Sequence, residues 1–247
     1  MSSLDTWLRD VGAVLRDPER LADTLVRLQV DPSDATDPSG RGLKFYTRAA
    51  RHRRTKFLRF GFPRLLRGLG PQTSKLLLAR TLAGHPGSDT DWSRNAIGLL
   101  DALTVLVEDG VIPPPALDIA RHELALAEVV RTADAPLPAV DVASAVPNPT
   151  LVLRSVPWDL PGWLASGAPV PDQVTEASVE LAYFLHPITL KPWWRRVDDS
   201  LRASLKVAVD RVPPAEAAAL LGVSEAAVLM LLGTAVEQGV LCAESMR

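Results

Sequence analysis

The chain has 247 residues, of which 47% are hydrophobic and 23% charged, and its formal net charge is −2. This composition is typical of a globular protein with one large or two modest domains, and it excludes a largely disordered chain. The balanced charge also excludes a uniformly basic nucleic-acid-binding surface, although it leaves room for a local basic patch.

The single cysteine, Cys242, cannot form an internal disulfide, so we expect a reducing compartment. The first ten residues include Asp5 and Asp10, where a signal peptide would need basic and then apolar residues. The most apolar window, residues 217–236, is interrupted by Ser224 and Glu225, which argues against a membrane span. We therefore expect a cytoplasmic protein that does not enter the membrane.

Helical spacing of apolar residues dominates the first half of the chain. It predicts a helix over residues 4–28, which Pro18 divides, and then a loop over residues 31–42. Further helices are predicted over residues 43–60, 63–69, 71–82, 92–109 and 116–132. Because no strand pattern occurs in the first 130 residues, we predict an all-helical domain over residues 1–135.

The charge of this predicted domain reverses along the chain. From Arg41 to Arg80 there are twelve Lys and Arg, and no acidic residue lies between Asp37 and Asp89. The next stretch, residues 101–141, holds eight acidic and two basic residues. The two regions either neutralise each other inside one domain or meet a partner, and the sequence leaves both readings open. The expected core positions of the basic helix over residues 43–60 are Phe45, Ala49, Phe57 and Phe60.

The composition changes after residue 135. Residues 136–149 are rich in proline and lack periodicity, which predicts a linker. Residues 150–156, 178–186 and 188–194 are strand candidates. Between the first two, residues 157–175 contain Trp158 and Trp163 and are expected to form an irregular loop held by these tryptophans. We predict a small α+β domain over residues 150–247.

The C-terminal pattern predicts a helix-turn-helix. Helices are expected over residues 197–209, 214–221 and 225–238, with a turn at Gly222 and an extended end at residues 240–243. A helix that reads DNA supplies basic groups, whereas the third helix here has no Lys or Arg and carries Glu225 and Glu237. We therefore expect a winged-helix-like domain that binds protein or peptide. The alternative is a helix-turn-helix transcription regulator whose basic helices contact DNA.

Motifs for catalysis are absent from the sequence. The four histidines are scattered without metal-ligand spacing, and no nucleophile elbow, Walker loop or dinucleotide motif occurs. We therefore predict no catalytic residue, no metal site and no cofactor, and do not expect an enzyme.

A small sheet with a free edge can accept an extended peptide as an additional strand. The other reading is that the strands only close the core of their own domain. The residues expected to contact a peptide, chosen because they lie on the candidate strands, are Arg154, Val179, Leu181, Tyr183 and Leu185.

Three segments carry a family resemblance. FYTRAARHRRTKFLRFGFPRLLRGLG resembles a pattern of an aromatic start, basic residues and FPxLxxxLG, and LARTLAGHPGSD and PPPALDIARHELALAEVVRTADAP continue it in order. These segments cover most of residues 43–136 and are similar to the HvfC- and TglI-like partner proteins, a family often labelled as DNA-binding. Residues 193–241 resemble the winged-helix-like region of that family more loosely.

The resemblance implies that two proteins have separate roles. Such proteins accompany multinuclear non-haem iron-dependent oxidases that modify ribosomally made peptides, and the iron belongs to the oxidase. It implies that the protein forms a heterodimer with the oxidase through the helical domain and holds the precursor peptide with the C-terminal domain. Nucleic acid is not an expected partner, because the third helix of the C-terminal pattern lacks basic residues. The residues expected at the oxidase interface are Tyr46, Arg51, Arg54, Phe62, Arg64 and Glu123.

Overall fold

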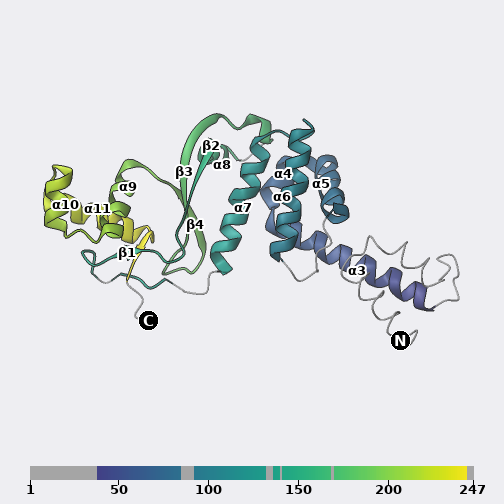
Figure 1. Cartoon of the computed structure of the whole chain (residues 1–247), viewed down its shortest axis with the longest axis horizontal. Coiled ribbons are helices and arrows are strands. Elements are labelled where there is room, and N and C mark those ends of the chain that lie inside the picture. The colour runs from purple at the N-terminus through teal and green to yellow at the C-terminus, as the bar shows by residue number, and fades with distance from the viewer. Residues whose placement is uncertain (1–37, 85–91, 132–135, 140, 168–169, 244–247) are drawn as a thin grey trace, which may run out of the picture. The chain divides into compact units, whose positions relative to one another are not determined.

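A computed structural model describes residues 38–84, 92–131, 136–139, 141–167 and 170–243 of the chain. The predicted fold class, mainly helical with a small sheet, is confirmed (Figure 1). The chain divides into two compact units between Arg121 and His122, with Val170–Asp172 grouped in the first. The division falls inside a helix, before residue 135 where the sequence placed the end of the helical domain.

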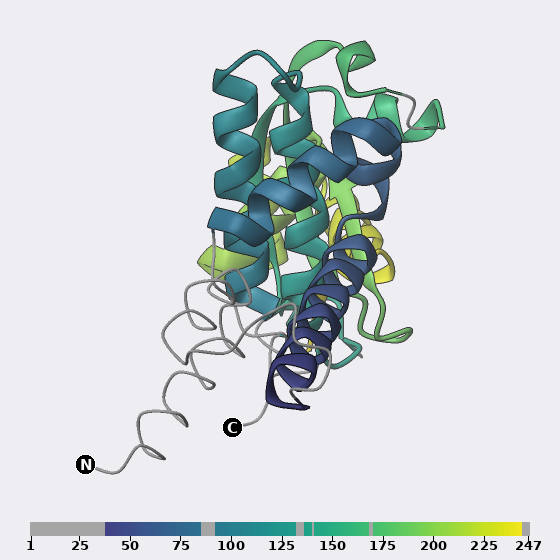
Figure 2. The ribbon, with the colours of Figure 1, turned by 90° about the vertical axis from the view of Figure 1, so that its right-hand side faces the viewer.

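Unit 1 is built from helices. They are α3 (Pro38–Gly61), α4 (Pro63–Gly68), α5 (Gly70–Gly84), α6 (Trp92–Glu108) and the first part of α7 (Pro115–Arg131). Helix α5 packs against α6, and α3 contacts both of them (Figure 2). The described part of this unit contains no strand, as the sequence predicted.

The break between α3 and α4 follows the predicted Gly-Phe-Pro sequence. The N–H of Phe62 still donates to the carbonyl of Leu58 at 2.9 Å, and Pro63 then begins α4 at a position that suits its fixed φ and missing N–H. Phe62 is fully buried and stacks on Trp92 of α6, with ring centroids 5.5 Å apart. The break therefore places an aromatic contact between α3 and α6.

The buried face of α3 differs from the prediction. Phe45, Phe57 and Phe60 are 68%, 41% and 86% exposed, so these expected core positions were wrong, and Ala49 is half-buried. The buried stripe instead contains Ala50, Arg54 and Leu58, spaced four residues apart. The helix also begins at Pro38, inside the predicted loop. The prediction placed the largest apolar side chains of α3 in the core. The buried stripe instead has Arg54 at its centre, and the phenylalanines lie outside it.

Unit 2 is organised around an antiparallel sheet of three strands in the order β2–β3–β4. Their bounds are Val152–Trp158, Glu176–Leu185 and Pro192–Arg196. The register pairs Val152 with Tyr183 and Tyr183 with Trp194. The third strand starts later than predicted because residues 186–191 form the turn from β3 to β4, where the N–H of His186 donates to Lys191 O and that of Leu190 to His186 O.

The predicted linker is partly built into unit 2. Strand β1 (Val146–Pro147) pairs with β5 (Leu241–Cys242), and Leu137 forms a bridge with Ala243. Ala145 and Asn148 are buried. Proline-rich composition correctly indicated irregular backbone, and within this stretch Ala145 belongs to the apolar cluster of unit 2 while Val146 and Pro147 pair with β5.

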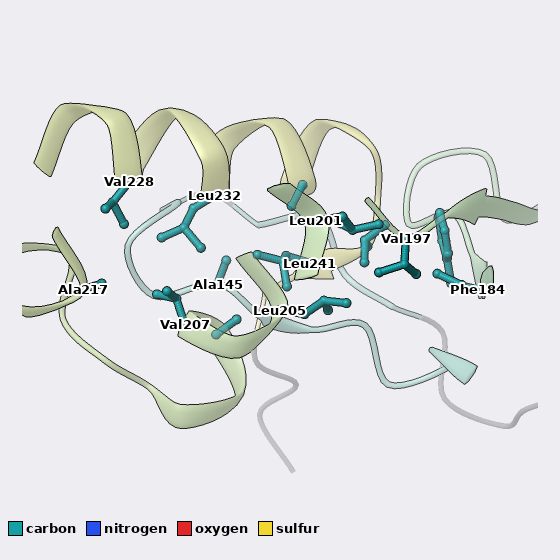
Figure 3. Close-up of a cluster of buried hydrophobic side chains, with 14 of the residues drawn as sticks. Ala145, Phe184, Val197, Leu201, Leu205, Val207, Ala217, Val228, Leu232 and Leu241 are labelled. Carbon is teal, nitrogen blue, oxygen red and sulfur yellow. The ribbon is translucent and has the colours of Figure 1, made fainter. Parts of the chain in front are cut away.

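The helix-turn-helix elements form as predicted. Helices α9 (Asp199–Asp210), α10 (Pro214–Leu221) and α11 (Glu225–Glu237) follow β4, and the pair α10–α11 is bent by 107°. Gly222 ends α10 in the left-handed conformation, with φ 68°. The three helices enclose an apolar cluster that includes Leu201, Val228 and Leu241 (Figure 3).

One further helix was not predicted. Residues 160–165 form α8 (Leu160–Ala165), whose Asp159 side chain caps the N-terminus by accepting from the N–H of Gly162 at 3.1 Å. A 3₁₀ turn, η2 (Pro171–Gln173), follows. Trp163 is buried in α8, in agreement with its expected role in holding this segment, whereas Trp158 is half-buried and ends strand β2.

Among the described helices, no single one is long and apolar enough to cross a membrane. Only the bent pair α10–α11 reaches the necessary length and composition together.

Candidate functional site

Strand β2 forms one edge of the three-stranded sheet. In the part of the chain that the structure describes, β2 pairs with β3 alone, and alternate residues of an edge strand direct N–H and C=O groups away from the sheet. Val152 and Leu153 are 39% and 46% exposed on this strand. Edge backbone groups and adjacent apolar side chains are the two features that strand addition requires.

The opposite edge, β4, is less suited to accept a strand. It begins with Pro192, which lacks an N–H, and ends with Arg195 and Arg196. Proline and charged side chains on an edge strand oppose pairing with another chain. Strand β2 also contains Pro157, but this residue lies at the register shift between Val156 and Trp158 near the end of the strand. Among the described residues, 152–156 therefore form the edge of the sheet without a second strand partner, and we call it the open edge.

Both faces of the central strand are covered. Tyr183 and Leu181 lie on the same face as Val152 and Arg154, while Ala182 and Phe184 belong to the apolar cluster enclosed by α9–α11. As a result every residue from Leu181 to Leu185 is buried. The alternating sequence pattern predicted this strand correctly but not the burial of both of its faces.

This arrangement changes the predicted peptide contacts. Val179, Leu181, Tyr183 and Leu185 lie on β3 and are at most 8% exposed, so their side chains are part of the core. Leu181 and Tyr183 are paired with both β2 and β4, whereas Val179 is paired with β2 and Leu185 with β4. Arg154 alone lies on the β2 edge, where its guanidinium forms an ion pair with Glu128 of α7 at 3.1 Å.

A buried polar network fixes the start of β2. The Asn148 amide nitrogen donates to the carbonyls of Leu185 and Gly239, at 2.9 and 2.8 Å. Its oxygen accepts from the N–H and the hydroxyl of Thr150, and that hydroxyl in turn accepts from the N–H of Leu185 at 2.8 Å. The network joins the entry to β2, the end of β3 and the turn before β5.

A histidine covers the other face of the sheet. His122 of α7 is 2% exposed; its Nδ1 lies 3.0 Å from the hydroxyl of Tyr183, and its ring stands edge-on to Trp194. This contact was not predicted from the sequence. Its position among the apolar residues of a helix was the available signal, but the partner residues are 61 and 72 positions away along the chain.

The residues expected at the oxidase interface are distributed between surface and core. Arg51 is exposed and Arg64 half-buried, whereas Arg54, Phe62 and Glu123 are buried at 1%, 0% and 5% exposure. Tyr46 lies in α3, and its side chain is outside the described set. The three buried residues are parts of the fold, and among the members of this set whose side chains are described, solvent reaches Arg51 and Arg64.

Arg54 has a structural role inside unit 1. Its Nε donates to the Oδ1 of Asn95 on α6 at 2.8 Å, and both side chains are 1% exposed. A buried cation requires such hydrogen bonds because its charge has lost contact with water. The resulting bond fastens α3 to α6 close to the contact between Phe62 and Trp92.

The surface of the helix-turn-helix is apolar and acidic. On α11, Leu229 and Met230 are exposed and the helix contains no Lys or Arg. On α10 and the turn that follows, Leu220, Leu221 and Val223 are exposed. Helices α10 and α11 therefore offer no Lys or Arg to a phosphate backbone, whereas α9 exposes Arg202 and Lys206.

The described residues contain no cluster of three or more His, Cys, Asp or Glu side chains arranged to hold a metal ion. Burial raises the pKa of the Cys242 thiol, against a smaller opposing effect of the Leu137 backbone hydrogen bond. Because the thiolate is the reactive form, this environment suits a packed side chain rather than a nucleophile.

No protein-family model matches the chain, and no curated protein matches it.

Proposed function

We propose that the protein is a non-catalytic adaptor that holds a ribosomally made precursor peptide for a multinuclear non-haem iron-dependent oxidase. The open edge of β2 is the observation that carries the proposal. A peptide strand added there would take its affinity from main-chain hydrogen bonds and its selectivity from contacts with Val152 and Leu153. In this proposal the protein and the oxidase form a heterodimer, and the iron is held by the oxidase.

The resemblance of residues 43–136 to the partner proteins of such oxidases supports the second half of the proposal. The exposed basic residues of unit 1, including Arg51, provide a surface for a protein partner. A winged-helix-like identity for residues 150–247 is part of the proposal, supported by the order helix, short helix, glycine turn, helix and short strand.

Copurification tests the adaptor function. The protein is co-expressed with the oxidase and the precursor peptide encoded by neighbouring genes, and the complex is isolated through a tag on the protein. We expect a 1:1 complex with the oxidase that also retains the peptide. A protein that binds neither the oxidase nor the peptide would refute the proposal.

A substitution on β2 tests the peptide site separately. Val152→Asp places a charge beside the open edge and should weaken peptide retention about tenfold, while the oxidase stays bound. The matched control is Val209→Asp, which places the same charge on α9 at a position 62% exposed. Equal peptide loss from both variants would contradict a site at β2.

The alternative function, transcription regulation, has less support. Helix α11 contains no Lys or Arg, and in this alternative the basic residues of α3 to α5 contact the DNA. Such binding would weaken steeply with salt because condensed counterions are released on binding. Sequence-specific retention of a genomic fragment in a gel-shift assay at moderate salt would favour this alternative.

A further inference from the structure

A groove on unit 1 combines a positive rim with an apolar floor. Its volume is ≈ 340 Å³. One cation comes from each of three helices: Arg59 from α3, Arg67 from α4 and Lys75 from α5. We call this feature the basic groove.

The floor of the basic groove is aliphatic. It is formed by Pro63, Leu66, Pro71 and Leu78. The Ser74 hydroxyl, which also lines the groove, donates to the carbonyl of Leu66 at 2.6 Å and so ties α5 to α4. Because this polar group is already bonded within the protein, the floor favours an apolar side chain. The volume is sufficient for one or two side chains.

The rim cations have no acidic residue beside them on their own helices. No Asp or Glu occurs in residues 38–84, which include all of α3, α4 and α5. The three rim cations are exposed, and none has an ion-pair partner among the described residues. Carboxylates are the groups in proteins that complement such cations, and arginine can bind them through two parallel hydrogen bonds.

From these observations we propose that the basic groove binds an acidic segment of a protein partner, with an aliphatic side chain of that segment on the floor between flanking carboxylates. The inference deepens the proposed function, since it gives the chemistry of the partner's docking segment. A peptide fits better than nucleic acid because the floor is aliphatic, whereas bases stack on aromatic rings. The exposed Phe57 and Phe60 are not part of the groove lining.

Selection from a random peptide library displayed on phage tests the proposal with the full chain and without any oxidase. We expect enrichment of sequences in which Asp or Glu flanks Leu, Ile, Val or Met. A synthetic, fluorescein-labelled peptide of the enriched sequence should then bind in an anisotropy titration, and more weakly as salt is added. Enrichment of sequences without acidic residues would overturn the proposal.

Charge-reversal variants test whether the enriched peptide binds in the basic groove. Arg67→Glu and Lys75→Glu should each weaken the enriched peptide about tenfold. Arg80→Glu is the control, because it changes the net charge equally on the same helix as Lys75 but outside the groove, where Arg80 forms an exposed pair with Asp109 at 3.4 Å. It should change the affinity less than about twofold. Equal effects of all three variants, or none, would overturn the proposal.

Nucleic acid is the competing outcome. If a random-sequence single-stranded oligonucleotide binds more tightly than the enriched peptide and loses affinity in Arg67→Glu and Lys75→Glu, the groove is a nucleic-acid site and the proposal is wrong. Failure of the oxidase copurification, with peptide binding intact, would refute the oxidase partner and leave the acidic ligand of the groove established.

Discussion

Gly61 is held in a close contact between α3 and α6 that leaves no room for a side chain. A Cβ atom at this position would lie 1.8 Å from Cη2 and 2.3 Å from Cζ3 of Trp92. The ring cannot move aside easily, because it is buried and stacks on Phe62. We predict that Gly61→Ala lowers the free energy of unfolding by about 1–3 kcal/mol, measured by urea denaturation.

Gly84, the last residue of α5, provides the matched control. A Cβ at Gly84 meets no atom within 4 Å. Gly84→Ala should change the stability by less than about 0.5 kcal/mol. If the two variants are equally stable, the contact between Gly61 and Trp92 does not limit the packing of unit 1.

The Thr150 hydroxyl closes the polar network of unit 2. It donates to Asn148 Oδ1 at 2.7 Å and accepts from the N–H of Leu185 at 2.8 Å. Thr150→Val keeps the shape but leaves this buried N–H without its acceptor, which should cost about 1–3 kcal/mol of stability in thermal or urea unfolding. Thr150→Ser retains the hydroxyl and should recover most of the loss. An equal loss in both variants would contradict the assignment of the effect to the hydroxyl.

At the scale of elements, helix α9 depends on one capping residue. Asp198 has extended backbone angles, and its carboxylate accepts from the N–H of Leu201 at 2.8 Å. Asp198→Ala should cost about 1 kcal/mol because it removes an acceptor from the exposed end of the helix. Asp198→Asn keeps the acceptor and should lose less, as circular dichroism during urea unfolding would detect. If Asp198→Asn loses as much stability as Asp198→Ala, the negative charge, rather than the hydrogen bond, stabilises the helix.

The positions of the elements could be largely predicted from the sequence, and their burial could not. Proline, glycine and capping residues gave α4, α10 and α11 nearly residue by residue, because these signals act within one turn of the chain. The burial of Arg54 depends on Asn95, which is 41 positions away. The same limitation applies to Leu181 and Tyr183, because only the assembled sheet shows that both faces of β3 are covered.

At the scale of the whole molecule, the sequence indicated two parts but placed their boundary by composition. The proline-rich stretch ends in β1, whose partner β5 lies at the other end of unit 2. Local composition carries no information about such a distant pairing. For the same reason the candidate peptide residues were chosen on the correct strands, while the distinction between the central β3 and the edge strand β2 needed the strand order.

The single cysteine allows the two units to be examined separately. Cys242 is fully buried in β5, burial raises its pKa, and reaction with a disulfide-exchange reagent requires that the thiol become exposed and ionised. Thr150→Val weakens the network around Gly239, three residues before this thiol, and should accelerate labelling about tenfold or more at a fixed pH.

Gly61→Ala changes the packing of unit 1 and should leave the labelling rate of folded protein unchanged. Because each unit has its own core, we expect the two to open independently. If Gly61→Ala accelerates labelling as strongly as Thr150→Val, the two units unfold as one cooperative body.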